Sequence, residues 1–363
     1  MSHNSQIMSH AAEGKIPGVS VVICCHNSAS RIPQTLRHLQ VQTGTFGIPW
    51  EVILVNNGST DDTEAVAQRV WAESAPVDLR IVDEPQPGLN HARLRGLMES
   101  RFEFLSLIDD DNWVAPDWVR KVFTILSTKP SVAACGGRGS AVSETAPPFW
   151  FPMFESAFAV GPQGEREGVV PKERAFLYGA GLTVRASVWR RLLADGHRMV
   201  LSDRKGNSLS SGGDSELCHA LVLAGWKLWY DPSLTFHHFI PESRLRWDYL
   251  RALHRGFGTA AAWLELYKWQ IVPPGSMRFR WLPFPESWCC AIRKSWPFQV
   301  YATIQTVWRQ KQRVGESWRQ QECEGSAEVL RMEWEFARAK ELVRNPLRYG
   351  QVRRSIENAK WSS

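Results

Sequence analysis

Short runs of apolar, mostly β-branched residues recur along the first half of the chain. They lie at residues 19–24, 51–55, 79–82 and 104–108. Mostly apolar runs of this length are typical of strands that are covered on both faces of a sheet. Between them, apolar residues spaced three or four positions apart predict helices. Strands that alternate with helices in this way predict βαβ units and a mostly parallel sheet.

Capping and turn residues indicate where the helices begin. Ser30, and either Asp61 or Thr60, can accept hydrogen bonds from first-turn N–H groups of two helices. Two more helices are expected to begin near Gly88 and Pro116. Residues 144–174 are rich in Pro, Gly and aromatic residues and are expected to form a long surface loop. Farther along, the pattern predicts helices at 186–193 and 214–224 and strands at 227–230 and 235–238, the last two joined by Asp231 and Pro232.

Length and composition fit a globular protein with a large α/β domain and an appended region. The chain has 363 residues, of which 44% are hydrophobic and 22% charged, a mixture that excludes wholesale disorder. No run of 18 uncharged apolar residues predicts a membrane-spanning helix. The polar residues 1–16 are expected to form a flexible N-terminus rather than a secretory signal. Seven cysteines without a CxxC pair favour reduced thiols in the cytoplasm.

Charge and tryptophan are concentrated in the last third of the chain. Residues 241–363 hold 21 Lys and Arg against 12 Asp and Glu, which is a net charge of +9. Ten of the 18 tryptophans follow residue 246. A basic, Trp-rich region of this kind favours an anionic partner, either nucleic acid or the surface of an anionic membrane.

Polar residues follow three of the predicted strands. They are Cys25-His26-Asn27 after the first strand, residues 56–61 after the second and Asp109-Asp110-Asp111 after the fourth. Because open parallel sheets bind ligands at the carboxyl ends of their strands, all three segments are expected on one rim. Neither a Walker A loop nor a GxGxxG motif follows the first strand, which argues against a P-loop NTPase and a dinucleotide dehydrogenase.

The acidic triplet at 109–111 indicates a cation site. Three adjacent carboxylates repel one another unless a cation offsets their charge, and their hard oxygen atoms suit Mg²⁺ or Mn²⁺. The alternative is that one aspartate caps the helix near Pro116 and that the other two are solvated.

Four segments in order make the chain similar to the family 2 glycosyltransferases of the GT-A fold. They are residues 19–23, 55–61, 88–93 and 107–111, and the resemblance covers about residues 17–245. It implies an α/β, Rossmann-like domain whose mostly parallel sheet is flanked by helices, with a basic, Trp-rich helical region over residues 246–363. It also implies an enzyme that takes a sugar from a nucleotide-sugar donor with the help of Mn²⁺ or Mg²⁺.

The same resemblance implies roles for the residues on the rim. Asp109 would approach the nucleotide ribose, and Asp111 would bind the metal ion. The family often has two aspartates where this chain has Asn56 and Asn57. Arg93 is expected near the diphosphate, because a guanidinium suits phosphate oxygens; a solvated helix face is the alternative. The donor-binding residues that the resemblance implies are Asn27, Asn56, Asn57, Arg93, Asp109 and Asp110.

A general base for the acceptor hydroxyl is expected at the start of the helix at 214–224. The family usually has a Glu-Asp pair there, and this chain has Gly213 and Asp214. A carboxylate in the first turn of a helix is kept ionised by the helix dipole, so Asp214 can accept a proton at neutral pH. Glu216 is the second candidate. The alternative is that Asp214 serves only as the N-cap of the helix.

The doublet His237-His238 lies in a predicted strand, where many GT-A enzymes place a histidine against the metal or the diphosphate. Because neighbouring strand residues face opposite ways, one of the two is expected to reach the site. His238 is the first candidate as a metal ligand and His237 the second. A structural role is equally open.

Two parts of the basic region are candidates for contacts. Residues 308–313 and 318–319 combine Trp with Lys and Arg, which favours peripheral association with an anionic membrane. No nucleic-acid-binding motif accompanies them. A helical stripe expected to pack on the protein itself consists of Val329, Met332, Phe336, Ala339 and Val343, opposite Arg331, Glu335, Arg338 and Glu341.

Together these features predict an inverting glycosyltransferase of polysaccharide or cell-surface glycan biosynthesis. Its acceptor would be a hydroxyl of a glycan or of a lipid-linked sugar, and no nucleic acid is expected as a partner. Trp150, Phe151 and Tyr178 are the expected acceptor wall, although the aromatic segment could equally cover the core. A cytoplasmic location, at the cytoplasmic face of the membrane, would suit such an acceptor. Two other functions stay open: a metal-dependent nucleotidyltransferase and a non-catalytic scaffold that binds sugar nucleotides or membranes.

Overall fold

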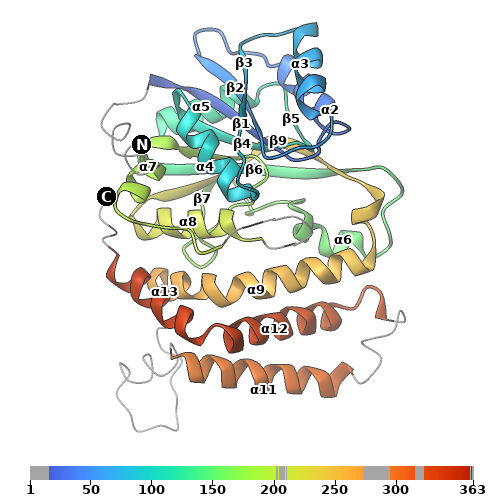
Figure 1. The fold of residues 1–363 in the computed structure, drawn as a ribbon, viewed down its shortest axis with the longest axis vertical. Helices are drawn as coiled ribbons and strands as arrows, with labels where there is room; N and C mark the ends of the chain where they lie inside the picture. The colour runs from blue at the N-terminus through green and yellow to red at the C-terminus, as the bar shows by residue number, and fades with distance from the viewer. Residues whose placement is uncertain are drawn as a thin grey trace.

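The computed structural model describes residues 16–201, 203, 209, 211–272, 295–314, 323–359 and 361. A central sheet with helices on both faces forms the upper part of the molecule, and a layer of long C-terminal helices lies below it (Figure 1). The mixed α/β class with a helical C-terminal part is therefore confirmed. Residues 318–319 and nearly all of the expected flexible N-terminus lie outside the described residues.

The four predicted apolar runs form parallel strands at one side of the sheet. These strands lie side by side in the order β3-β2-β1-β4. Alternate residues face opposite cores: Val21 and Leu54 pack under one set of helices, whereas Val22 and Ile53 pack under the other. Both faces of β1, β2 and β4 are covered, which is why these strands are mostly apolar. Two of their buried polar residues pair with each other, since Ser20 Oγ donates a hydrogen bond of 2.8 Å to Glu51. The strands are β1 (Ile16–Cys25), β2 (Trp50–Asn56), β3 (Leu79–Asp83) and β4 (Phe102–Asp109).

Helices cover both faces of the sheet. The first core lies beneath α2 (Ile32–Gln40), α3 (Thr63–Glu73) and α5 (Trp118–Thr128). The second core lies beneath α4 (Leu89–Glu99), α7 (Ala186–Ala194) and α8 (Gly213–Leu223). Each helix begins within three residues of its predicted position. Ser30 does not cap α2, whose N-cap is Arg31, but Asp61 Oδ1 accepts a hydrogen bond of 3.1 Å from the N–H of Thr63, the first residue of α3.

The other side of the sheet is more mixed than the sequence pattern predicts. It continues in the order β8-β6-β9-β5, with β7 paired to β9, and only the β6–β9 pair there is parallel among the described strands. Two predicted strands around Asp231-Pro232 are one strand, β9, because residues 231–234 bulge out between the pairs Gly136–Tyr230 and Arg138–Thr235. A bulge accommodates Pro232, which has no N–H to donate. The strands are β5 (Asn112–Val114), β6 (Val132–Ser143), β7 (Gly168–Val169), β8 (Leu182–Arg185) and β9 (Lys227–Ile240).

The segment expected as a long loop contains short helical turns. They are α6 (Phe151–Phe154) and η1 (Glu155–Phe158), and a further turn, η2 (Glu242–Arg244), follows β9. Trp150 and Phe151 are buried in a third core with Trp247 of the C-terminal region. The aromatic residues of this segment therefore hold it against the protein.

The C-terminal helices are stacked in layers beneath the sheet. Helix α9 (Trp247–Ile271) lies against the sheet domain, α12 (Ala327–Arg344) lies beneath α9, and α11 (Trp296–Val314) is outermost (Figure 1). A fourth helix, α13 (Pro346–Asn358), packs at one end. Two cores contain residues from both sides of residue 245, so the proposed boundary there crosses continuous packing and stays a prediction. Among the described residues, no helix has the length and apolarity needed to span a membrane.

The predicted stripe on α12 is only partly buried. Val329, Met332 and Ala339 are buried as expected, but Phe336 is 55% and Val343 is 52% exposed. Conversely, Arg338 was expected on the solvated face and is 7% exposed. It donates hydrogen bonds to Gln299 on α11 and to Glu265 on α9. The prediction of a single buried stripe was wrong in this respect. Helix α12 lies between α9 and α11, so two of its faces are covered instead of one.

Candidate active site

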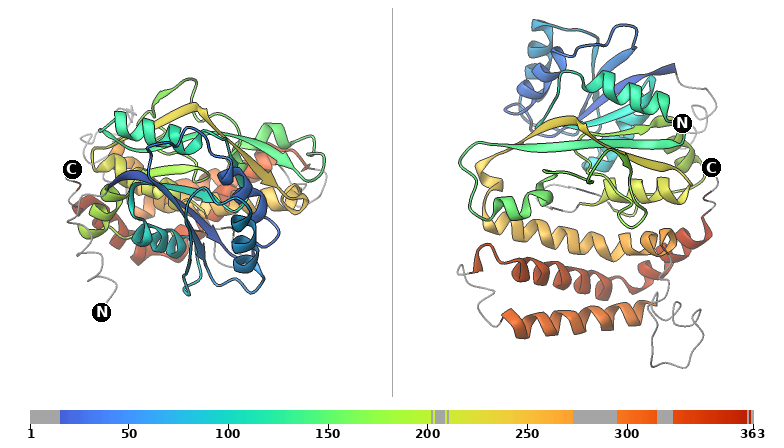
Figure 2. Two further views of the ribbon diagram at one scale, coloured as in Figure 1. Left: turned by 90° about the horizontal axis from the view of Figure 1, so that it is seen from above. Right: turned by 180° about the vertical axis from the view of Figure 1, so that it is seen from behind.

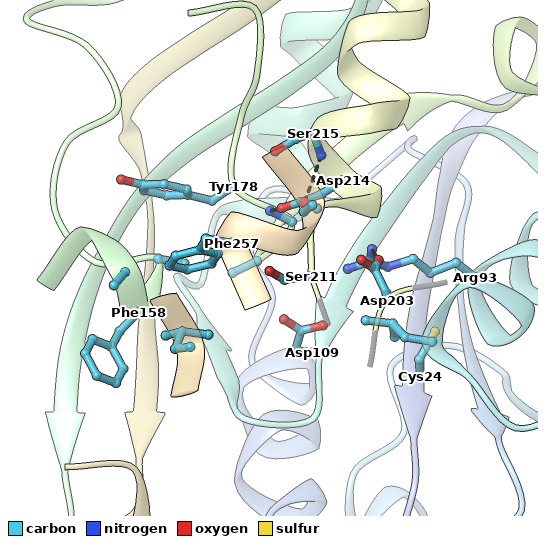
Figure 3. A pocket seen from close by; sticks show the side chains of 18 of the residues that line it. Cys24, Arg93, Asp109, Phe158, Tyr178, Asp203, Ser211, Asp214, Ser215 and Phe257 are labelled. Carbon is cyan, nitrogen blue, oxygen red and sulfur yellow. Dashed lines mark hydrogen bonds and ion pairs between the residues drawn. The ribbon is translucent and has the colours of Figure 1, made fainter. Parts of the chain in front are cut away.

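One cavity brings together the residues that the sequence placed on the sheet rim and at the start of α8. It has a volume of about 900 Å³, and both Asp111 and Asp214 line it, although they are far apart in the chain. In Figure 3 the Asp109 carboxylate points into this cavity from the end of β4, with Asp214 across from it. The shared cavity is the arrangement that the predicted chemistry requires.

The acidic triplet is held by arginines and a hydroxyl. Asp110 accepts hydrogen bonds from Ser28 and from Arg31, whose Nη2 lies 2.6 Å from Asp110 Oδ2. Burial and the neighbouring Asp111 carboxylate raise the pKa of Asp110, which the Arg31 charge opposes. Asp111 Oδ2 forms an ion pair with Arg244 Nη1 at 2.8 Å. Asp110 and Asp111 are therefore buried and paired with different partners, whereas Asp109 is partly exposed at the cavity.

His238 faces Asp111 because the pairing of β5 with β9 sets Asn112 opposite His238. His238 Nδ1 lies 2.6 Å from the carbonyl oxygen of Phe158. A carbonyl only accepts hydrogen bonds, so in the neutral ring Nδ1 carries the proton and Nε2 carries a lone pair. That Nε2 lies 3.5 Å from Asp111 Oδ1. Two acceptor atoms, His238 Nε2 and Asp111 Oδ1, therefore face each other at the wall of the cavity.

This pair of atoms fits a divalent cation. Ligands that each lie about 2.0–2.2 Å from one ion are commonly 3–3.5 Å apart, and carboxylate oxygen with imidazole nitrogen suits Mn²⁺. Among the described residues no group of three or more His, Cys, Asp or Glu side chains forms a closed metal site. An open set of two protein ligands suits an ion that also binds waters and substrate phosphates. His237 does not line the cavity; its Nδ1 lies 2.8 Å from Ser140 Oγ at the surface.

Arg93 and Asp203 form a buried ion pair that reaches the start of α8. Arg93 Nη1 lies 2.9 Å from Asp203 Oδ2, and both side chains are more than nine-tenths buried. Burial opposes the charge of Arg93, but nearby carboxylates, Asp203 foremost, raise the pKa of its guanidinium. Asp203 Oδ1 also accepts a hydrogen bond of 2.6 Å from the N–H of Gly213. Sequence analysis missed Asp203, since no pattern surrounds it.

Asp214 lies in the first turn of α8 and is not its N-cap. The cap position is Gly212, whose φ of 108° favours glycine. Asp214 Oδ2 accepts a hydrogen bond of 2.6 Å from the N–H of Gly179, and Oδ1 accepts one from Ser215. These two hydrogen bonds fix the orientation of the carboxylate beside the cavity. The half-buried Asp214 can therefore accept a proton from a group in the cavity.

Glu216, the second candidate for the base, lies behind the cavity wall. It is fully buried and accepts hydrogen bonds from the N–H groups of Val200 and Leu201 and from the hydroxyl of Tyr267. Burial raises the pKa of Glu216 to about 7. Because Glu216 does not line the cavity, this geometry favours Asp214 as the base.

Of the three candidate asparagines, Asn57 lines the cavity and Asn27 and Asn56 do not. Asn57 Nδ2 donates to the carbonyl oxygens of Glu84 and Gln86, and Oδ1 accepts from the N–H of Gly88. A carboxylate could not donate the first two bonds. The amide at position 57 therefore shapes the turn that leads into α4. Asn27 and Asn56 instead make hydrogen bonds with Thr60 and Asp83.

The acceptor residues are only partly brought together. Tyr178 lines the cavity (Figure 3), whereas Trp150 and Phe151 lie in a core outside it. The Trp150 Nε1 donates to Glu324 at 2.7 Å. Helix α9 supplies the wall that sequence analysis missed, including Leu253 and Phe257. The aromatic and apolar residues of α9 gave no signal of their own, because such residues on a helix usually indicate a core.

Known glycosyltransferases are similar to this chain. The family described as "Glycosyl transferase family 2" matches residues 20–192. Glucosyl-dolichyl phosphate glucuronosyltransferase of Haloferax volcanii is 24% identical over 244 residues, which are 66% of this chain and 75% of that protein. The putative glycosyltransferase EpsH of Bacillus subtilis is 29% identical over 121 residues. The match covers 33% of this chain and 33% of EpsH. The crystal structure of S. aureus TarS 1-349 in complex with UDP-GlcNAc aligns with a TM-score of 0.48 and 13% identity, over 94% of this chain and 91% of that chain.

The matched residues contain the parallel strands, the acidic triplet and Arg93, and they define a glycosyltransferase domain of the α/β class. The protein is a glycosyltransferase whose residues 20–192, a little under half of the chain, match family 2. This similarity argues against a nucleotidyltransferase. The carboxylate of Asp214 in the same cavity argues against a scaffold without catalysis.

Proposed function

We propose that the protein is an inverting glycosyltransferase. It would move a sugar from a nucleotide-sugar donor to a hydroxyl of a glycan or lipid-linked acceptor in polysaccharide or cell-surface glycan biosynthesis. The observation that carries this proposal is the single cavity lined by both Asp111 and Asp214. The match of residues 20–192 to family 2 supports the reaction class, because enzymes of that family use nucleotide-sugar donors.

The donor would lie along the strand ends, with its diphosphate near Asp109 and Arg93. Asp111 and His238 would hold Mn²⁺ or Mg²⁺, which offsets charge on the diphosphate leaving group when bound. Arg93 lines the same cavity and is fixed by Asp203, so its guanidinium is positioned before the donor arrives. The residues of this chain would thus orient the donor and stabilise its negative charge.

Asp214 would act as the general base. Its carboxylate takes the proton of the acceptor hydroxyl while that oxygen forms a bond to the anomeric carbon. The bond from this carbon to the diphosphate oxygen breaks on the opposite side, and the bonding electrons leave with the nucleoside diphosphate. A single displacement through an oxocarbenium-like transition state inverts the anomeric centre. The hydrogen bond from the N–H of Gly179 orients the Asp214 carboxylate for this step.

The acceptor would bind between Tyr178 and the α9 wall. Aromatic rings such as those of Tyr178 and Phe257 offer flat apolar surfaces to a sugar ring. The name of the H. volcanii relative identifies a lipid-phosphate-linked sugar as the acceptor of that protein. A lipid-linked acceptor is therefore our first choice. Peripheral association of the basic C-terminal region with an anionic membrane, at its cytoplasmic face, belongs to the same proposal.

The test is a thermal-shift screen of nucleotide-sugars with MnCl₂, followed by transfer assays with the donor that stabilises the protein. Asp111→Ala is expected to lose the Mn²⁺-dependent part of the stabilisation. Asp214→Asn is expected to keep donor binding and to lose at least a hundredfold in transfer rate, because general-base catalysis contributes about that factor. Asp117→Asn, at the start of α5 and away from the cavity, is the control. Wild-type transfer by Asp214→Asn, or loss of its donor binding, would contradict the assigned role.

A further inference from the structure

The outermost helix, α11, packs inward with Trp296 and Val300 against a core, but it also buries polar residues and exposes apolar ones. Its inner face carries Gln299 and Thr303, which are 8% and 1% exposed and accept hydrogen bonds from Arg338 of α12. Its outer face carries Tyr301, Ile304 and Trp308, which are 62%, 49% and 56% exposed. The spacing of three and four residues places these side chains on one stripe of the helix. Figure 2 (right) shows no described element beyond α11 on that side.

A helix that ends the protein in water normally has the opposite arrangement, with apolar residues inward and charges outward. Single exposed apolar residues are common, but an aligned set on one helix face indicates an interaction surface. Because the inner face is already paired through Arg338, α11 cannot turn its apolar stripe inward without leaving that guanidinium short of partners. The stripe therefore faces outward as part of the stable packing.

The composition of the stripe and of its surroundings favours a membrane. Tyr and Trp prefer the level of the lipid headgroups, because their rings are apolar and carry one polar group. Arg309 and Lys311 are exposed directly after the stripe, and the last third of the chain has a net charge of +9. Such cations are attracted to the anionic surface of a bilayer.

The size of the stripe argues against a second copy of the chain as its partner. With about half of each side chain exposed, and about 150–250 Å² for a whole aromatic side chain, the stripe offers on the order of 300 Å². A stable dimer usually buries about 800 Å² on each partner. A bilayer needs no matching protein surface, so a short stripe with adjacent cations is sufficient.

We propose that Tyr301, Ile304 and Trp308 form a membrane-docking face that enters the headgroup layer of an anionic bilayer, where Arg309 and Lys311 contact lipid phosphates. This inference rests on the proposed function in one respect, namely that a lipid-linked acceptor gives docking a purpose. It assigns the membrane contact to the outer face of α11. Docking through this face would hold the enzyme at the surface without a helix that crosses the bilayer.

The experiment is vesicle flotation of the full chain with phosphatidylcholine vesicles. A second set of vesicles contains about 30% phosphatidylglycerol, which gives a strongly negative surface. The wild type is expected to float with the anionic vesicles, less so as salt is raised. The double variant Ile304→Glu/Trp308→Glu is expected to lose at least about tenfold in partitioning, since two apolar groups no longer enter the bilayer. Arg309→Gln/Lys311→Gln is expected to lose the preference for anionic vesicles.

The matched control is Phe46→Glu, which changes another fully exposed aromatic residue in the loop between α2 and β2, at the other end of the molecule. It should float like the wild type. Thermal unfolding of each variant with and without a nucleotide-sugar separates docking from folding and from donor binding. Three outcomes would overturn the proposal: the wild type does not float, the stripe variant floats like the wild type, or the stripe variant changes only the oligomeric state measured by sedimentation. None of them would bear on the proposed transfer reaction.

Discussion

Replacing Glu216 by Gln is expected to change how the stability of the protein depends on pH. Glu216 lies in the first turn of α8, and its side chain is fully buried. Burial raises its pKa from 4.5 to about 7, although hydrogen bonds from Val200, Leu201 and Tyr267 favour the charged form. The folded protein therefore holds a proton on Glu216 that the unfolded chain has already released between pH 4.5 and 7.

The magnitude follows from linkage between protonation and folding. A difference of about 2.5 pKa units corresponds to roughly 3 kcal/mol, at 1.36 kcal/mol for each unit. The sign is that of an acid with a raised pKa: its contribution to stability is fully present below pH 4.5 and is lost as the pH rises through about 7. Glu216 should therefore lower the free energy of unfolding by about 3 kcal/mol across this range and leave it constant above pH 8.

The assay is urea unfolding of the wild type and of Glu216→Gln at pH values from 4.5 to 8. The glutamine does not titrate, so the stability difference between the two proteins should change by about 3 kcal/mol in favour of the variant as the pH rises. Loss of one acceptor for the Val200 and Leu201 N–H groups shifts the whole curve but not its slope. Glu73→Gln, an exposed glutamate at the end of α3, is the control. A difference that stays constant within about 0.5 kcal/mol would refute the reasoning, given the usual agreement between independent sites.

Two further predictions concern burial and close packing. Arg93→Ala should lower the free energy of unfolding by about 3–5 kcal/mol in urea titrations, because it leaves the Asp203 carboxylate buried without its guanidinium partner. Adding Asp203→Asn should recover part of this loss. A cost of Arg93→Ala below about 1 kcal/mol would contradict a buried ion pair. Gly258→Ala should cost about 1–3 kcal/mol, because the new Cβ would lie 2.0 Å from the carbonyl oxygen of Trp334 where α9 meets α12. Gly350→Ala on α13, where a Cβ meets nothing closer than 3.8 Å, should instead stabilise by about 0.5–1 kcal/mol; equal effects at the two glycines would disprove the close approach.

The parallel half of the sheet could be predicted because its strands are covered on both faces. Strands β1, β2 and β4 are mostly apolar runs, and such runs are visible in a single sequence. The strand β6 was not predicted, because its sequence Val-Ala-Ala-Cys-Gly-Gly-Arg-Gly-Ser-Ala-Val-Ser contains mostly small residues without a clear alternation. Its place in the sheet depends on β8 and β9, which pair with it from distant parts of the chain.

The candidate site was predictable where strand ends and helix starts carry charge. Asp111 and Asp214 could be placed together because strand ends share one rim and because the motifs resemble a known family. Asp203 could not be found, since its partners, Arg93 and Gly213, belong to different helices. Trp150 and Phe151 were expected at the cavity and lie in a core, because aromatic rings look alike in a sequence whether they bind ligands or fill space.

Helix α9 has a consequence for engineering. It contributes Phe257 to the cavity on one side and meets the backbone of Trp334 through Gly258 on the other. A chimera that grafts a related catalytic half onto this chain at residue 246 would separate the cavity from one of its own walls. A junction placed after Ile271 would instead transfer the wall together with the catalytic half. The incoming helix would then need a small residue at the position of Gly258, where it packs against the backbone of Trp334.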